Sequence, residues 1–269
     1  MPLAQRLLLS LALTWPDPMS ATPIEVAVDT QAAVRHESAV RVWDLPVRIF
    51  HWSLVVAIVA AYVTSQLGGE WMRWHGRIGS FVLALLVFRL IWGFIGTPHA
   101  RFAGFVPTPN RLIAYFKGQW RGVGHSPLGA LSVIALLTLV AAQVVTGLFS
   151  NDDIAFSGPW AHWIAKGTSE RLTGWHEQIF NALAGFILLH VLAIAFYLVA
   201  RRSNLVAAMI TGNKVLSGGA PEAAAAMQRP GWRLIAAVMV AVSVPWLIFR
   251  EIPPAQAQPV AAPAATADW

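Results

Sequence analysis

The chain has 269 residues, of which 57% are hydrophobic and 12% are charged, with a formal net charge of +6 and a mean hydropathy of +0.58. About a quarter of the residues of a soluble domain are charged, so this composition and several apolar runs near 20 residues predict an integral membrane protein with no nucleic-acid partner. The absence of cysteine excludes disulfides, haem attached through C-x-x-C-H and thiolate-bound iron–sulfur clusters.

Residues 1–40 are predicted to form an N-terminal tail without a membrane span. Their apolar stretch, residues 7–15, is about nine residues long, which is too short to cross a bilayer and lacks a small-residue cleavage pattern. Met19 is an alternative start of translation. The sequence leaves open whether this tail belongs to the mature protein.

Four apolar spans follow, and together they define a bundle domain over residues 41–210. The spans are expected at about 46–66, 72–95, 127–149 and 174–201. Between the second and third spans lies a basic loop whose segment 111–116 is predicted to form a short interfacial helix. The fold class is therefore an all-α integral membrane protein built on a four-helix transmembrane bundle.

The C-terminal part adds three segments to this bundle. Residues 211–230 are expected to be a linker rich in small residues, and residues 231–250 a fifth transmembrane helix that Pro245 interrupts. Residues 251–269 are rich in Pro and Ala and are predicted to be a disordered tail.

The distribution of Lys and Arg between the loops predicts the orientation. The N-terminal segment, the loop after the second span and the linker after the fourth carry twelve of these residues, whereas the segments on the opposite side carry four. Because Lys and Arg accumulate on the cytoplasmic side, the N-terminus is predicted to be cytoplasmic in a multi-pass protein of the bacterial inner membrane.

Two histidines, His176 and His190, lie in the fourth span, 14 residues apart. In a helix this spacing separates them by roughly 21 Å along the axis and leaves both on nearly one face. One helix could therefore contribute ligands to two cofactors, one near each membrane surface.

The predicted topology pairs these histidines with two others at matching depths. His51 lies at the start of the first span and matches His190 on the cytoplasmic side; His75 lies at the start of the second span and matches His176 on the outer side. Paired imidazoles on facing helices are a common way for a bundle to hold haem b with both axial positions filled. Such iron transfers electrons and does not activate oxygen.

Several nearby residues are expected to support these pairs. Arg48 and Arg77, close in sequence to His51 and His75, are placed to meet haem propionates. Gly79 and Gly185 could leave room for a macrocycle. His125 is an alternative ligand on the cytoplasmic side.

Other polar residues are expected to have less specific roles. Arg89 is interpreted as a snorkelling residue, and Gln143 and Thr146 are equally compatible with interhelical hydrogen bonds and a quinone contact. His36, His99 and His162 lie in the tail or loops and are expected to be solvated.

From about Arg41 to Met209 the chain resembles the bacterial cytochrome b561 and nickel–iron hydrogenase b-subunit family. The matching segments are VWDLPVRIFHW in the first span, WHGRIGSFVLALLVFRLIWGFIGTPHARF in the second and WHEQIFNALAGFILLHVLA in the fourth. The resemblance implies a four-helix bundle with two noncovalent b haems bound by His51, His75, His176 and His190. The fifth span and the tail lie outside this resemblance.

The resemblance further implies electron transfer between quinone or quinol and a second redox protein, such as a hydrogenase, another dehydrogenase or a c-type cytochrome. The segment GTPHARFAGFVP is more similar to these members than to a superoxide-oxidising branch. A self-contained superoxide:quinone oxidoreductase is the alternative, with Arg73, Arg77, Lys166 and Arg171 as a cationic entrance. A structural or transport protein with incidental histidines, or a metal site, is a third possibility.

Overall fold

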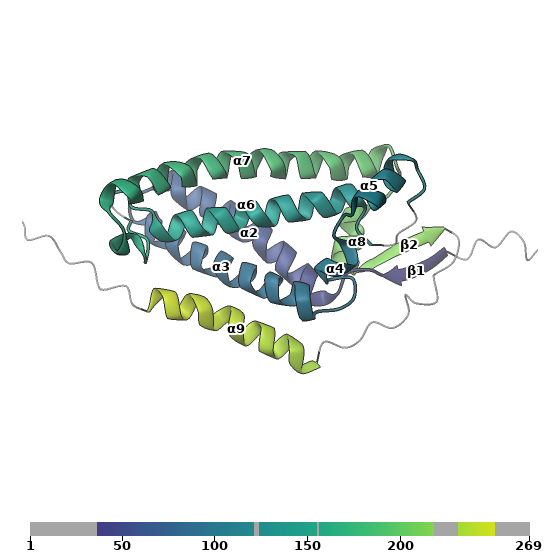
Figure 1. Cartoon of the computed structure of the whole chain (residues 1–269), viewed down its shortest axis with the longest axis horizontal. Helices are drawn as coiled ribbons and strands as arrows, with labels where there is room; N and C mark the ends of the chain where they lie inside the picture. Colours follow the sequence, from purple (N-terminus) through teal and green to yellow (C-terminus); the bar gives the residue numbers. More distant parts are fainter. Residues whose placement is uncertain (1–36, 121–123, 155, 218–230, 251–269) are drawn as a thin grey trace, which may run out of the picture.

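The computed structural model describes residues 37–120, 124–154, 156–217 and 231–250, and it shows an elongated bundle of long helices (Figure 1). These helices are α2 (Leu45–Leu67), α3 (Trp71–Ile95), α6 (Pro127–Phe149), α7 (Lys166–Val199) and α9 (Gly231–Phe249). All five are long and apolar enough to cross a membrane. The predicted all-α membrane fold is confirmed. The expected tails at residues 1–36 and 251–269, and the linker from residue 218, lie outside the described residues.

Local signals at the helix ends explain why the first and third spans begin close to their expected starts. The Asp44 carboxylate caps α2 by accepting a hydrogen bond from the Val47 N–H at 2.7 Å, and the Ser126 hydroxyl caps α6 in the same way. A proline follows each cap in the first turn, where its missing N–H costs nothing. Helix α2 ends at Gly68, whose φ of +62° favours glycine.

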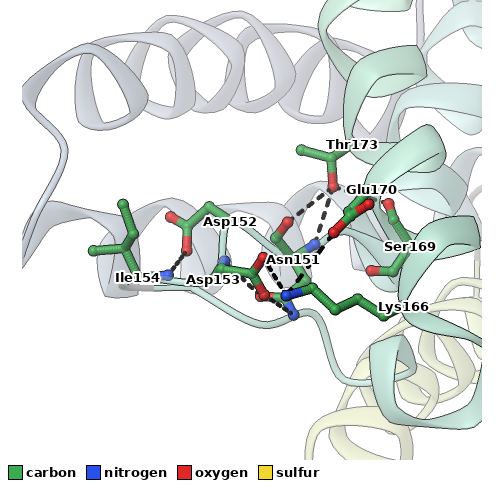
Figure 2. Close-up of polar contacts among 8 residues, drawn as sticks. All are labelled: Asn151, Asp152, Asp153, Ile154, Lys166, Ser169, Glu170 and Thr173. Atoms are coloured by element: carbon green, nitrogen blue, oxygen red, sulfur yellow. Dashed lines mark hydrogen bonds and ion pairs between the residues drawn. The ribbon is translucent and has the colours of Figure 1, made fainter.

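Helix α7 begins eight residues before the expected start of the fourth span. Its first turns contain the polar sequence TSER, which does not look like a membrane span. They are fixed instead by the end of α6, where the Ser169 hydroxyl donates to the Phe149 carbonyl at 2.6 Å. The Thr173 hydroxyl also accepts from the Asn151 N–H at 3.1 Å (Figure 2). These contacts fix the height of α7 relative to α6.

Helix α3 is the central packing element. One buried cluster joins it to α2 and α9 through Phe50, Phe88, Trp92, Ala237 and Ala241. A second buried cluster joins α2, α3, α6 and α7 through Ala57, Val82, Leu86, Val140 and Leu183. Helix α9 therefore packs on the outside of the bundle, against the flank of α3 (Figure 1).

Short elements close one end of the bundle, and we call this end the Asp44 end. They are α4 (Phe102–Phe105), α5 (Pro109–Phe116) and α8 (Leu205–Thr211). Helix α5 matches the expected interfacial helix, and the Tyr115 hydroxyl lies 2.7 Å from the Tyr197 hydroxyl of α7.

The segments on either side of the bundle domain are not simply tail and linker, as the sequence suggested. Strands β1 (Glu37–Arg41) and β2 (Asn213–Ser217) pair antiparallel, with Glu37 opposite Ser217 and Arg41 opposite Asn213. The Gly212 carbonyl accepts from the Val42 N–H at 2.8 Å and thereby continues the pairing. A pairing across some 170 residues leaves no periodic signal in either short segment, which is why it was missed.

Asp44 is the centre of a buried polar cluster at this end. Besides capping α2, its carboxylate accepts from the Trp92 indole N–H at 2.9 Å and from the Thr97 hydroxyl at 2.6 Å. Asp44 is 4% exposed, so all three hydrogen bonds are shielded from water. One side chain thus fixes the start of α2 against the end of α3.

The expectation that Arg89 snorkels to the membrane surface is wrong. Its side chain is 3% exposed, donates to the Ala100 carbonyl at 3.2 Å and lies over the Phe102 ring at 4.7 Å. The loop after α3 folds back over the guanidinium, and the nearby Asp44 carboxylate supplies an opposite charge. Arg89 is therefore a buried structural residue.

His125 belongs to the same end of the bundle. Its ring lies 4.4 Å from those of both Trp43 and Phe105, measured between centroids. Burial, followed by the positive charges of Arg89 and His99, lowers the pKa of His125 to about 3. The imidazole is therefore neutral at physiological pH and packs as an aromatic residue.

Candidate functional site

The structure places His75 of α3 beside His176 of α7. Their ring centroids are 6.1 Å apart and their planes are inclined by 80°. A bond between a metal and an imidazole nitrogen is about 2 Å long, so two imidazoles on opposite sides of one metal have centroids about 6 Å apart. The spacing of this pair therefore suits a single metal held between the rings.

Both rings of this pair are oriented by main-chain carbonyls. The Nδ1 atom of His75 lies 2.9 Å from the Ala61 carbonyl oxygen, and that of His176 lies 2.9 Å from the Gln143 carbonyl oxygen. A carbonyl oxygen only accepts hydrogen bonds, so Nδ1 carries the proton in both rings. Nε2 is then the unprotonated nitrogen, as metal ligation requires.

Gln143 and Thr146 make interhelical hydrogen bonds with His176, one of the two roles left open by the sequence. The Thr146 hydroxyl lies 3.2 Å from Nδ1, and the Gln143 amide nitrogen lies 3.0 Å from Nε2. The Gln143 Oε1 atom is buried without a partner among the described residues. At Gly147 an added Cβ would lie 3.0 Å from the His176 ring, so glycine permits this close approach.

His51 of α2 and His190 of α7 are the second predicted pair. They lie near enough to interact electrostatically, and both are partly buried. The His51 Nδ1 atom is buried without a hydrogen-bond partner in the part of the chain described. His190 Nδ1 has only a long contact, 3.4 Å from the Ser132 hydroxyl. A buried imidazole nitrogen without a hydrogen-bond partner is unusual in a folded protein, and it is compatible with a ring that binds a cofactor.

One uninterrupted helix carries a histidine of each predicted pair. Helix α7 runs from Lys166 to Val199, so His176 and His190 are separated by roughly 21 Å of helix rise, as expected. One turn after His176, the Phe180 ring of α7 stacks on the Tyr62 ring of α2 at 5.2 Å. This stack joins the two helices that carry His51 and His190.

Arg48 serves in the structure as an anchor for α8. Its Nε–H donates to the Met209 carbonyl at 3.3 Å, and an Nη2–H donates to the Ile210 carbonyl. A guanidinium has five N–H donors, so these contacts leave donors that could meet a carboxylate. Arg48 lies one turn before His51, on the same side of α2.

The structure does not bring Arg77 to His75. Two residues along a helix correspond to about 200°, so the two side chains leave α3 on nearly opposite faces. The Arg77 guanidinium lies over the Trp74 ring at 4.9 Å and lines a groove of about 600 Å³ between α2 and α3, together with Trp52 and Phe81. Its expected contact with a haem propionate stays a prediction.

Two further expectations concern the glycines and the loop histidines. An added Cβ at Gly79 or Gly185 would meet nothing within 4 Å, so there is open space beside both residues. Of the loop histidines, His162 packs against Trp163 and His99 lies near His125. His36 lies outside the described residues.

The donor set fits haem better than a metal held by protein alone. Among the described residues, no group of three or more His, Cys, Asp or Glu side chains could hold a metal ion. Structural zinc takes four protein ligands and catalytic zinc usually three. Two imidazoles suffice only where another molecule supplies the remaining ligands, as a porphyrin does for iron.

The fold is that of a multi-pass helical membrane protein, and a match to a family model makes the class a b-type cytochrome of membrane electron transport. The model of the prokaryotic cytochrome b561 family matches residues 42–212. The chain belongs to this family, and the family implies haem b as a cofactor. Helix α9 lies outside the matched region.

Curated relatives carry consistent names. The chain is 26% identical to a probable Ni/Fe-hydrogenase B-type cytochrome subunit of Azotobacter chroococcum, over 72% of this chain and 96% of the relative. Proteins of the same name from Bradyrhizobium diazoefficiens, 25% identical over 65% of this chain and 85% of the relative, and a hydrogenase 1 subunit from Escherichia coli, 21% identical over 56% and 80%, are also similar. No solved structure gives a significant match.

The sequence missed the groups that orient the histidines. They are the Ala61 and Gln143 carbonyls, which also accept hydrogen bonds from the hydroxyls of Thr64 and Thr146, respectively. Gln143 and Thr146 drew attention as polar residues in an apolar span, whereas Thr64 did not. Thr64 could have been found in the same way as Thr146, because it too is a polar residue within an apolar span.

Proposed function

We propose that this protein is a di-haem b-type cytochrome that carries electrons across the bacterial inner membrane. His75 and His176 would be the axial ligands of one haem, and His51 and His190 those of the other. The observation that carries the proposal is the His75–His176 pair, with its 6.1 Å ring spacing and both Nδ1 atoms bound to carbonyls.

The chain's own residues would bind and orient the cofactors. Haem iron, when bound, supplies one-electron oxidation and reduction. The carbonyls of Ala61 and Gln143 orient the rings of His75 and His176 through their Nδ1 atoms, and the Gln143 amide nitrogen, 3.0 Å from His176 Nε2, would give up that position to iron. Arg48 is the basic residue best placed to meet a propionate near His51. Helix α7 sets the distance between the two haem sites.

The redox partners follow from the relatives and the topology. We propose a hydrogenase, another dehydrogenase or a c-type cytochrome as one partner, because the similar proteins carry the name of hydrogenase cytochrome subunits. Quinone or quinol in the membrane would be the other. The excess of Lys and Arg in the N-terminal segment and in the loops on the same side supports a cytoplasmic N-terminus.

The superoxide:quinone oxidoreductase alternative is less well supported. It needs a cationic entrance near His75 and His176, but Lys166 is paired with Asp153 at 2.9 Å, and Arg73 with Glu70 (Figure 2 shows the former). These pairs neutralise two of the four expected cations. The positive field that would attract a small anion is correspondingly weaker.

The proposal is tested on the purified full chain in detergent. The pyridine haemochrome assay is expected to give two noncovalent b haems per chain, and anaerobic addition of duroquinol is expected to reduce them in part. A colourless protein would overturn the cytochrome assignment, and one haem per chain would overturn the second site. Stopped-flow mixing with superoxide is expected to reduce the haems no faster than free haem; a much faster rate would favour the alternative.

A further inference from the structure

The two histidine pairs differ in how the protein holds their second nitrogen. At the His75–His176 pair, each accepting carbonyl lies three residues before a threonine in the same helix, Ala61 before Thr64 and Gln143 before Thr146. We call each combination a threonine–carbonyl clamp.

The two clamps have the same geometry although they stand on different helices. The Thr64 hydroxyl lies 2.8 Å from the Ala60 carbonyl and 3.0 Å from the Ala61 carbonyl. The Thr146 hydroxyl lies 2.8 Å from the Ala142 carbonyl and 3.1 Å from the Gln143 carbonyl. Both threonines are buried, at 7% and 6% exposure. A hydroxyl bonded back to its own helix bends the helix locally, which is compatible with a carbonyl tilting outward to the imidazole.

The His51–His190 pair has no equivalent support in the described residues. His51 Nδ1 is buried and unpartnered, and the closest hydroxyl to His190 Nδ1 is that of Ser132, at 3.4 Å. A distance of 3.4 Å lies beyond the usual range for a protein hydrogen bond. One pair is therefore clamped by main-chain acceptors and the other is not.

This difference has an electronic consequence for any metal the pairs hold. A hydrogen bond from Nδ1–H to a strong acceptor raises the basicity of Nε2. A more basic ligand stabilises the oxidised metal relative to the reduced metal, and second-shell hydrogen bonding is one of the means by which proteins set haem potentials.

We propose that the threonine–carbonyl clamps make His75 and His176 the low-potential haem site and leave His51 and His190 as the high-potential site. This inference rests on the ligation proposed above. An electron that enters at the clamped pair passes downhill, oxidising that iron and reducing the iron at the other pair. In the proposed orientation, the favourable direction is from the outer surface towards the cytoplasm.

A spectroscopic redox titration of the full chain assigns the potentials. Wild type is expected to titrate in two waves, the lower one missing in His75→Ala and His176→Ala and the higher one missing in His51→Ala and His190→Ala. The reverse assignment, or a single wave containing both haems, would overturn the inference while leaving the cytochrome assignment intact. Absence of haem in wild type would instead overturn the proposed function.

A second variant tests the clamp itself. Thr146→Val removes the hydroxyl that lies 3.2 Å from His176 Nδ1 while keeping the shape of the side chain. The lower wave is expected to shift upward and the higher wave to stay in place. Thr138→Val, an exposed threonine of the same helix, is the matched control and is expected to move neither wave. A Thr146→Val protein with both haems and unchanged potentials would contradict the role of the clamp.

Discussion

The two ends of the bundle use charged residues in opposite ways. At the Asp44 end, Asp44 and Arg89 are only 4% and 3% exposed. Their hydrogen-bond partners lie in α2, in α3 and in the loop after α3. At the other end, Lys166 pairs with Asp153 on the surface, where their side chains are 66% and 47% exposed. A buried charge is costly to leave unpaired, whereas a surface ion pair contributes little. The same residue types near the ends of spans therefore carry different structural importance.

The largest effect is expected from Asp44→Ala. This change removes the acceptor of three buried donors, from Val47, Trp92 and Thr97, and should cost about 3 to 5 kcal/mol of stability. Thermal unfolding of the detergent-solubilised protein, followed by tryptophan fluorescence, measures the loss. Asp44→Asn retains an acceptor oxygen and is expected to lose less. Equal midpoints for the two variants would contradict the central role of the carboxylate.

A smaller effect at the same end depends on pH. His125 is neutral in the folded protein because burial lowers its pKa to about 3 from 6.5, so the unfolded chain binds more protons between these values. Stability should therefore be complete above pH 6.5 and should fall by about 1.4 kcal/mol per pH unit below it.

The comparison of wild type with His125→Phe isolates this contribution. Phenylalanine fits between the Trp43 and Phe105 rings and cannot take up a proton. Its unfolding midpoint should depend less steeply on pH between 6.5 and 4.5. Parallel pH profiles for the two proteins would show that His125 is not the group responsible.

The smallest effect is expected at the opposite end. Lys166→Ala removes both ion pairs made by this side chain, with Asp153 and Glu170 (Figure 2). Because the groups are exposed, the unfolding midpoint should not change measurably. Asp153→Ala should behave alike. A clear loss of stability in either variant would mean that the two ends are more similar than their exposure suggests.

Features that depend on local sequence were predictable. Apolar runs near 20 residues located the spans, and helix geometry placed His176 and His190 on one face of α7. Features that depend on contacts between distant segments were not. The burial of Arg89 under Phe102, and the pairing of β1 with β2, require the folded chain. The role predicted for Arg77 at a propionate stays a prediction; its guanidinium lies over the Trp74 ring, a contact that sequence proximity to His75 did not indicate.

The candidate site shows the same division. The depth argument brought His75 to His176, because the height of a residue in the membrane follows from its position in a span. The clamps were not predictable, because a carbonyl that turns toward a neighbouring helix has no sequence signature of its own. Only the threonines that accompany these carbonyls, Thr64 and Thr146, are visible in the sequence.

The central claim is that four histidines form two haem sites, and the most direct test is haem stoichiometry in single and paired variants. His75→Ala and His176→Ala should each retain one haem per chain, and the double variant should also retain one. The same pattern is expected for His51→Ala and His190→Ala, whereas a variant that combines His75→Ala with His51→Ala should retain none. One haem in that cross-pair variant, or none in a double variant within one pair, would contradict the pairing.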